Sequence, residues 1–174
     1  MDPDLQRLHD EIHLITSGLS AEKLGWRTAG KWSAAEILEH LYRTYIGTIK
    51  GLSRVLASGI ANKQATLRQR AAAMIVVQIG YFPNGIQSPA AVRPRGVPSE
   101  QVVAEIGSKI SEMDTVLASC ASKFGENTKV LEHPFLGPFS VAQWRKFHLR
   151  HGMHHLKQIQ RLRRLMAAAV EENG

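Results

Sequence analysis

The chain lacks most features that would link it covalently to itself or carry it across a membrane. Cys120 is the only cysteine in 174 residues, so no intramolecular disulfide can form, and a lone thiol is typical of a reducing compartment. No run of about 18 apolar residues occurs, which excludes a membrane-spanning helix. The first residues contain no basic run followed by an apolar core, so we expect no secretory leader. These absences predict a soluble cytoplasmic protein in which Cys120 is a small buried hydrophobic residue.

Aromatic residues are also scarce, at 6% of the chain, and they are too scattered for a base-stacking platform. The formal charge of +7 would favour contact with phosphate, but charges of both signs are spread along the chain. The densest basic group is Arg161, Arg163 and Arg164, near the end of the last predicted helix, where cations oppose the negative end of the helix dipole. We therefore expect no nucleic-acid partner.

The chain has no internal repeat and no convincing strand pattern, whereas helical periodicity is present throughout. Apolar stripes predict helices over residues 4–18 and from Ser99 to Gly125. A third helix is predicted over 63–80, although its β-branched residues also permit a strand. The segment 81–98 holds four prolines and two glycines, so it is predicted to be an irregular loop, and its length suggests that it covers a site.

Two capping boxes predict the starts of the remaining long helices. Ser33 is followed by Glu36 at the third helical position, and Ser140 is followed by Gln143 at the same spacing. The first of these helices is expected to end at Gly59. The pattern predicts an all-α single domain over 1–174, with four long helices and one shorter helix packed as a bundle.

Four of the eight histidines fall within eight residues of the last predicted helix. At about 100° per residue, His148, His151 and His155 lie in one stripe with Trp144 at one end, whereas His154 points elsewhere. This stripe is the face that should pack inward. Because an unpaired buried imidazole nitrogen costs about 1–3 kcal/mol, three inward-facing histidines indicate a functional site.

The spacing of His151 and His155 places two imidazoles one turn apart, close enough to hold one metal ion. A third ligand must come from another helix, and His40 is the candidate, because it lies about 60° from Ile37 at the edge of the inward stripe. Three neutral histidines leave positions open for water or substrate, as in catalytic zinc sites. The alternative is a polar network in the core without an ion.

Several neighbouring side chains have both a functional and a structural interpretation. His148 could be a fourth ligand, a donor to a ligand, a proton shuttle or a hydrogen-bonded core histidine. Gln158 could orient a ligand or pair with the backbone. The side chains that could line an apolar pocket, or simply pack in the core, are Phe135, Phe139 and Trp144. The residues expected to lie outside the site are Glu36 as a helix cap, His133 in a loop, and His9 and His13 on the surface.

Two separated segments, "KWSAAEILEHLYRTY" and "HPFLGPFSVAQWRKFHLRHGMHHLKQIQRL", cover about a quarter of the chain. Together they resemble the DinB-like superfamily, particularly its branch with a His-Pro-Phe-Gly loop before the last helix. Leu136, which stands between Phe135 and Gly137, departs from that loop pattern. The resemblance implies an antiparallel four-helix bundle with an added helix that is frequently a homodimer. It also implies a divalent metal ion, which could be zinc, nickel, manganese or iron, on His40, His151 and His155.

Members of this superfamily with an assigned reaction look like metal-dependent transferases that add small thiols, such as bacillithiol or mycothiol, to electrophiles. Others are assigned as hydrolases. The resemblance therefore implies a metal-dependent thiol transferase or hydrolase that acts on a small-molecule substrate. The alternative is a non-catalytic bundle that binds a metal ion or another ligand, and nothing in the sequence separates thiol transfer from hydrolysis.

Overall fold

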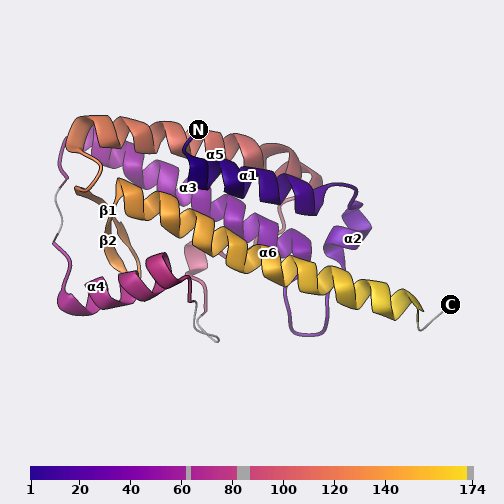
Figure 1. The fold of residues 1–174 in the computed structure, drawn as a ribbon. Helices are drawn as coiled ribbons and strands as arrows, with labels where there is room; N and C mark the ends of the chain where they lie inside the picture. The colour runs from indigo at the N-terminus through magenta and orange to yellow at the C-terminus, as the bar shows by residue number, and fades with distance from the viewer. Residues whose placement is uncertain (62–63, 82–86, 172–174) are drawn as a thin grey trace.

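Four helices form the body of the protein in the computed structural model, which describes residues 1–61, 64–81 and 87–171. They are α1 (Pro3–Thr16), α3 (Ala34–Ser58), α5 (Ser99–Phe124) and α6 (Val141–Glu171). The four helices lie side by side as a bundle, and α6 projects beyond its neighbours towards the C-terminus (Figure 1). The predicted all-α bundle is confirmed.

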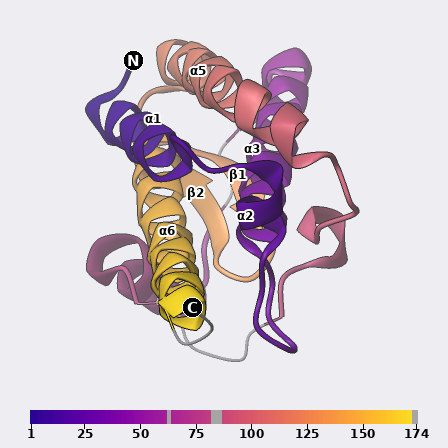
Figure 2. The same ribbon diagram turned by 90° about the vertical axis from the view of Figure 1, so that its right-hand side faces the viewer.

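The helices of the bundle form two couples that run in opposite directions. In one couple, Leu8 of α1 lies against Gly152 of α6 and Ile15 lies against Arg163, so the two helices are parallel. The other couple, α3 and α5, is also parallel, and the end-on view shows how the two couples enclose a common core (Figure 2). Helix α3 therefore runs antiparallel to α6, and His40 of α3 lies opposite His151 and His155 of α6.

The predicted capping boxes begin both long helices of the site. Ser33 Oγ accepts a hydrogen bond from the Glu36 amide at 3.2 Å, and Glu36 Oε2 accepts from the Ser33 amide at 2.7 Å. Ser140 and Gln143 form the same reciprocal pair at the start of α6. Gly59 ends α3 with a φ of 68°, the left-handed conformation that glycine adopts without strain.

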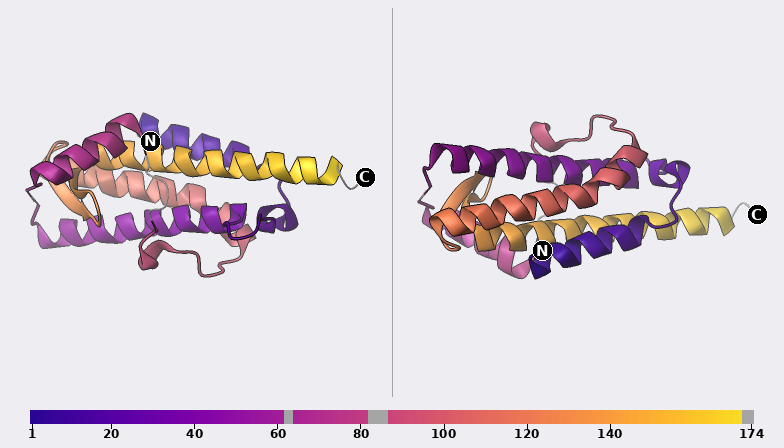
Figure 3. Two further views of the ribbon diagram at one scale, coloured as in Figure 1. Left: turned by 90° about the horizontal axis from the view of Figure 1, so that it is seen from below. Right: turned by 90° about the horizontal axis from the view of Figure 1, so that it is seen from above.

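A long crossover joins α3 to α5, because two parallel helices need a connection that returns along the bundle. It contains α4 (Leu67–Ala73), the π-helix η1 (Met74–Ile79) and the 3₁₀ turn η2 (Ala90–Val92). The helix predicted over 63–80 is confirmed from Leu67 onward, and residue 63 lies outside the described residues. Residues 87–98 of the loop predicted over 81–98 lie alongside α3 (Figure 3), whereas 82–86 lie outside the described residues.

Two elements differ from the sequence prediction. A β-hairpin of β1 (Lys129–His133) and β2 (Gly137–Ser140) precedes α6, so the prediction that the chain has no strand is wrong. Its strands have five and four residues, too short for a recognisable alternation of apolar and polar residues. The five-residue helix α2 (Ala21–Gly25) was also not predicted, since it spans little more than one turn.

The core lies between the helix couples and continues under the hairpin. Cys120 is completely buried within it, and this burial raises the pKa of the thiol, so the residue packs as the predicted small hydrophobic side chain. Among the described residues, no helix is long and apolar enough to cross a membrane.

Candidate metal centre

The structure brings together the three histidines that the sequence nominated as metal ligands. His40 extends from α3, and His151 and His155 extend from successive turns of α6. The Nε2 atom of His151 lies 3.4 Å from His40 Nε2 and 3.1 Å from His155 Nε2. One ring nitrogen from each residue falls within 4.8 Å of the other two. The antiparallel packing of α3 on α6 thus gathers three imidazoles at one point.

These separations fit a shared metal ion. Two imidazole nitrogens bound tetrahedrally to zinc at about 2.0–2.1 Å are about 3.3 Å apart. The alternative, direct hydrogen bonding between the rings, is incomplete, because one proton on His151 Nε2 can serve only one of its two neighbours. A cation satisfies all three nitrogens at once, and the donor set therefore favours a metal site over a polar network.

Hydrogen bonds on the far sides of two rings direct their lone pairs towards this point. His40 Nδ1 lies 2.9 Å from the Val92 carbonyl oxygen, an acceptor only, so Nδ1 carries the proton. His155 Nδ1 lies 2.9 Å from Gln158 Oε1 and donates in the same way. In the neutral tautomers that result, Nε2 of both rings is an unprotonated base, which is the form that binds metal.

The surroundings also keep the three imidazoles neutral. Burial lowers the pKa of His40, and it lowers the pKa of His155 to about 3, with a further contribution from the nearby His40. The pKa of His151 falls well below its ordinary value because of burial and the adjacent histidines. All three side chains therefore offer a lone pair near pH 7.

The neighbouring polar residues occupy different places. The Gln158 carboxamide connects two histidines, because its Oε1 accepts from His155 and its Nε2 lies 3.2 Å from His154 Nε2. His154 lies outside the cluster of candidate ligands. His148 also lies outside the cluster, completely buried against Tyr45 and Trp144. Neither ring nitrogen of His148 has a hydrogen-bond partner among the described residues.

Helix α3 also fixes the crossover segment beside the site, through a residue that the sequence analysis missed. The carboxylate of Glu39, only 2% exposed, accepts hydrogen bonds from the backbone amides of Arg95, Gly96 and Val97 at 2.7, 3.0 and 3.2 Å. Two adjacent residues of α3 thus bind the same loop: Glu39 accepts from its backbone amides, and His40 donates to the Val92 carbonyl oxygen. An acidic residue in a capped helix gives no sequence signal for this role, because its partners are backbone atoms of a distant segment.

A cavity of about 830 Å³ opens beside the histidine cluster. All three candidate ligands line it, together with residues of α3, the crossover, the hairpin and α6. Two of the predicted pocket residues, Phe135 and Trp144, lie on its wall, whereas Phe139 is completely buried in the core behind it. The volume is in the range of small-molecule sites.

His133 stands on the same wall at the end of β1. Its Nδ1 accepts from the amides of Phe135 and Leu136, both at 3.3 Å, and its ring stacks on Phe139. It therefore holds the hairpin turn, as the sequence suggested, and lies outside the candidate metal cluster. Burial lowers its pKa to about 4.

The remaining histidines lie away from the site on α1. His13 is exposed, and the partly exposed His9 pairs with Asp10 at 3.1 Å. Both agree with their predicted surface positions.

Comparison with models of known protein families gives a match that covers most of the chain. The model of the DinB superfamily matches residues 4–159, a range that includes all three candidate ligands. No curated protein and no solved structure gives a significant match. The match covers well over half of the chain, so the chain belongs to the DinB superfamily.

Proposed function

We propose that the chain binds a divalent metal ion through His40, His151 and His155 and acts on a small molecule in the adjoining cavity. The convergence of three neutral imidazoles on the wall of a cavity of about 830 Å³ carries this proposal. Imidazole ligands suit zinc, nickel and iron, whereas manganese prefers oxygen ligands. We therefore expect zinc, nickel or iron rather than manganese.

The reaction proposed is a thiol transfer to an electrophile or a hydrolysis. When bound at such a site, a divalent ion lowers the pKa of a coordinated thiol or water and supplies a nucleophile near neutral pH. The protein's own part is to orient and enclose. The Val92 carbonyl and Gln158 hold the Nδ1 protons of His40 and His155, and the apolar wall, including Trp144, holds the substrate and excludes water.

The alternative is a bundle that binds a metal ion or another ligand without catalysis. The cavity argues against a purely structural metal site, because such a site is closed on all sides and has no need of a pocket for a second molecule. A homodimer and a cytoplasmic location complete the proposal, and size-exclusion chromatography with light scattering measures the first.

Metal content is the first test. The protein is produced without a histidine affinity tag in medium supplemented with zinc, nickel, iron or manganese, and bound metal is quantified by mass spectrometry. We expect a stoichiometric ion in the unmodified chain and its loss in His151→Ala. The control is His13→Ala, an exposed histidine on α1 that does not line the cavity, and it should keep the ion. Absence of stoichiometric metal from the unmodified chain would contradict the proposal.

Turnover is the second test. The metal-loaded chain is screened with low-molecular-weight thiols against a fluorogenic electrophile, and separately with activated esters and amides. Activity that disappears in His151→Ala and persists in His13→Ala supports an enzyme, and the substrates that react distinguish thiol transfer from hydrolysis. Metal binding without any turnover would favour the non-catalytic alternative.

A further inference from the structure

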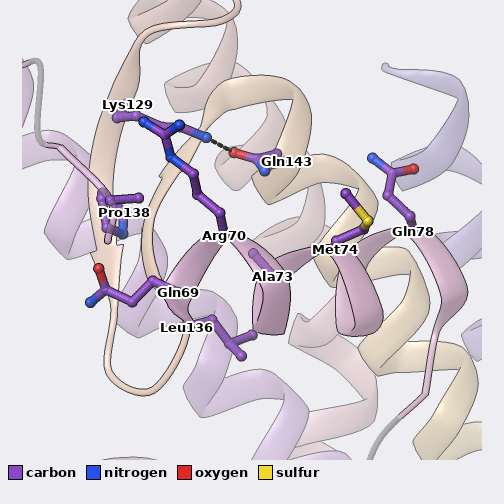
Figure 4. A pocket seen from close by; sticks show the side chains of 10 residues that line it. Gln69, Arg70, Ala73, Met74, Gln78, Lys129, Leu136, Pro138 and Gln143 are labelled. Atoms are coloured by element: carbon purple, nitrogen blue, oxygen red, sulfur yellow. Dashed lines mark hydrogen bonds between the residues drawn. The ribbon is translucent and has the colours of Figure 1, made fainter. Parts of the chain in front are cut away.

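A second and smaller cavity lies between α4, η1, β1, β2 and the start of α6 (Figure 4). Its volume is about 230 Å³. Leu136 lines both cavities, so the two are neighbours, but none of the histidines lines the smaller one. The side chains that line it are those of Ala65, Gln69, Arg70, Ala73, Met74, Gln78, Lys129, Leu136, Pro138 and Gln143.

Two cations from different elements meet in this cavity. Arg70 rises from α4 so that its guanidinium lies beside the side chain of Lys129 on β1 (Figure 4). Partial burial and, to a smaller extent, repulsion by the nearby charge of Arg70 lower the pKa of Lys129. None of the ten lining residues is acidic, and the Arg70 side chain has no hydrogen-bond or ion-pair partner in the described part of the chain. The cavity therefore holds positive charge that no protein carboxylate neutralises.

The carboxamides of the cavity present donors as well. Gln143 Oε1 accepts from Lys129 Nζ and from the Ser140 amide, and Gln69 Oε1 accepts from the Thr66 amide at 2.9 Å. Because these partners can only donate, the orientation of each carboxamide is determined, and each NH₂ group remains available.

The third carboxamide is oriented in the same way. Gln78 Oε1 accepts from Lys146 Nζ, which again leaves the NH₂ group as a donor. No described residue accepts a hydrogen bond from the NH₂ groups of these three glutamines. The polar side chains around the cavity thus offer two cations and three amide donors, and every carboxamide oxygen is already occupied.

We propose that this cavity is a binding site for a small oxyanion, such as a phosphate or carboxylate group, held by Arg70 and Lys129. A guanidinium binds such a group through two parallel hydrogen bonds, and an ammonium adds a point charge. A bound oxyanion would join α4, the hairpin and the first turn of α6, three segments that also carry or flank the walls of the larger cavity. The site is independent of the proposed metal centre, because it uses none of the three histidines.

The test is a titration with inorganic phosphate, sulfate and acetate at constant ionic strength, followed by calorimetry and by NMR shifts of backbone amides. We expect saturable binding of at least one anion, with the largest shifts in α4 and the hairpin. Arg70→Gln should weaken it by at least about tenfold, a change of about 1.4 kcal/mol. Arg68→Gln is the matched control, because Arg68 is exposed on the same helix and does not line the cavity.

Further measurements distinguish a specific anion site from general attraction of anions to a basic protein. Lys129→Gln should weaken binding as Arg70→Gln does, with circular dichroism and thermal melting used to verify its fold. His151→Ala should bind the anion normally, so the result does not depend on the metal centre. Tighter binding of phosphate or sulfate than of acetate identifies a phosphate-like ligand, and the reverse identifies a carboxylate. No saturable binding of any of the three anions, or equal weakening by Arg68→Gln and Arg70→Gln, would overturn the proposal.

Discussion

His40 Nδ1 lies 2.9 Å from the carbonyl oxygen of Val92, 52 residues further along the chain. This contact links the orientation of a candidate metal ligand to the conformation of the crossover segment. The neighbouring residue of the same helix, Glu39, holds the next part of that segment through three backbone amides. Disturbing the loop should therefore disturb the histidine.

Glu39→Gln is expected to loosen the crossover segment. One carboxylate oxygen becomes an NH₂ group that faces backbone N–H groups, so buried donors lose their acceptor and the free energy of unfolding falls by about 1–3 kcal/mol. Tryptic cleavage after Arg95 should accelerate, and metal affinity should weaken because Val92 no longer holds His40. Glu100→Gln, at an exposed position at the start of α5, is the control. Equal cleavage rates in the two variants would contradict the role given to Glu39.

Gln158→Leu is expected to weaken metal binding without removing a ligand. The substitution deletes the acceptor that holds the His155 Nδ1 proton, and loss of such a partner reduces metal affinity by about 10- to 100-fold in known sites. Competition with a chromophoric chelator measures the dissociation constant. Gln160→Leu, two residues along the same helix and exposed, makes the same chemical change away from the site. If both variants bind metal equally well, Gln158 does not orient His155.

The three candidate ligands could be nominated from the sequence because each lies at a helical spacing that can be read directly. His151 and His155 are one turn apart, and the rotation of His40 relative to Ile37 places it at the inward edge of its own helix. The hydrogen-bond partners of these candidate ligands were not predictable to the same degree. Val92 contributes a backbone carbonyl from an irregular segment, and no side-chain pattern encodes where such an atom will lie.

The hairpin is a part of the fold that the sequence did not predict. His133 was assigned to a loop, although it is the last residue of β1 and pairs with Gly137. Strands of four and five residues, with a bulge between Lys129 and Leu131, contain too few positions to establish a period of two. Their pairing depends on contacts with α3 and α6 that only the folded chain provides. Helix periodicity extends over many turns and was correspondingly easier to recognise.

His148→Phe is expected to reduce the acid sensitivity of the protein. Burial lowers the pKa of His148 to about 3, whereas an unfolded histidine titrates near 6.5. Well above pH 6.5, His148 is unprotonated in both the folded and the unfolded state, and it costs no stability there. As the pH falls from about 6.5 towards 3, only the unfolded state takes up the proton, so each such histidine lowers stability by up to about 1.4 kcal/mol per pH unit.

Phenylalanine cannot take up a proton, so it removes this loss of stability at low pH, and it keeps the aromatic contacts with Trp144 and Tyr45. We therefore measure urea unfolding of chelator-treated protein at several pH values. As the pH falls, the free energy of unfolding should decrease less for His148→Phe than for the unmodified chain. His13→Gln, at an exposed position on α1, should leave the profile unchanged. An identical loss in all three proteins would show that His148 does not contribute to acid unfolding.

Gly152→Ala is expected to destabilise the contact between α1 and α6. A Cβ atom at this position would overlap Leu8 Cδ1 and lie 3.4 Å from two further atoms of the same side chain. Leu8 is completely buried, so it has little room to move, and overpacking of this kind costs about 1–3 kcal/mol. The gain in helix propensity of up to about 1 kcal/mol offsets only part of that cost.

Gly47→Ala supplies the matched control, because no atom lies within 4 Å of a Cβ at that position of α3. The same substitution should there raise the free energy of unfolding by up to about 1 kcal/mol. Leu8→Val deletes the overlapping Cδ1 atom, so combining it with Gly152→Ala should give less destabilisation than the sum of the two single changes. Strict additivity in this cycle, measured by urea unfolding, would mean that Gly152 is needed for a reason other than its contact with Leu8.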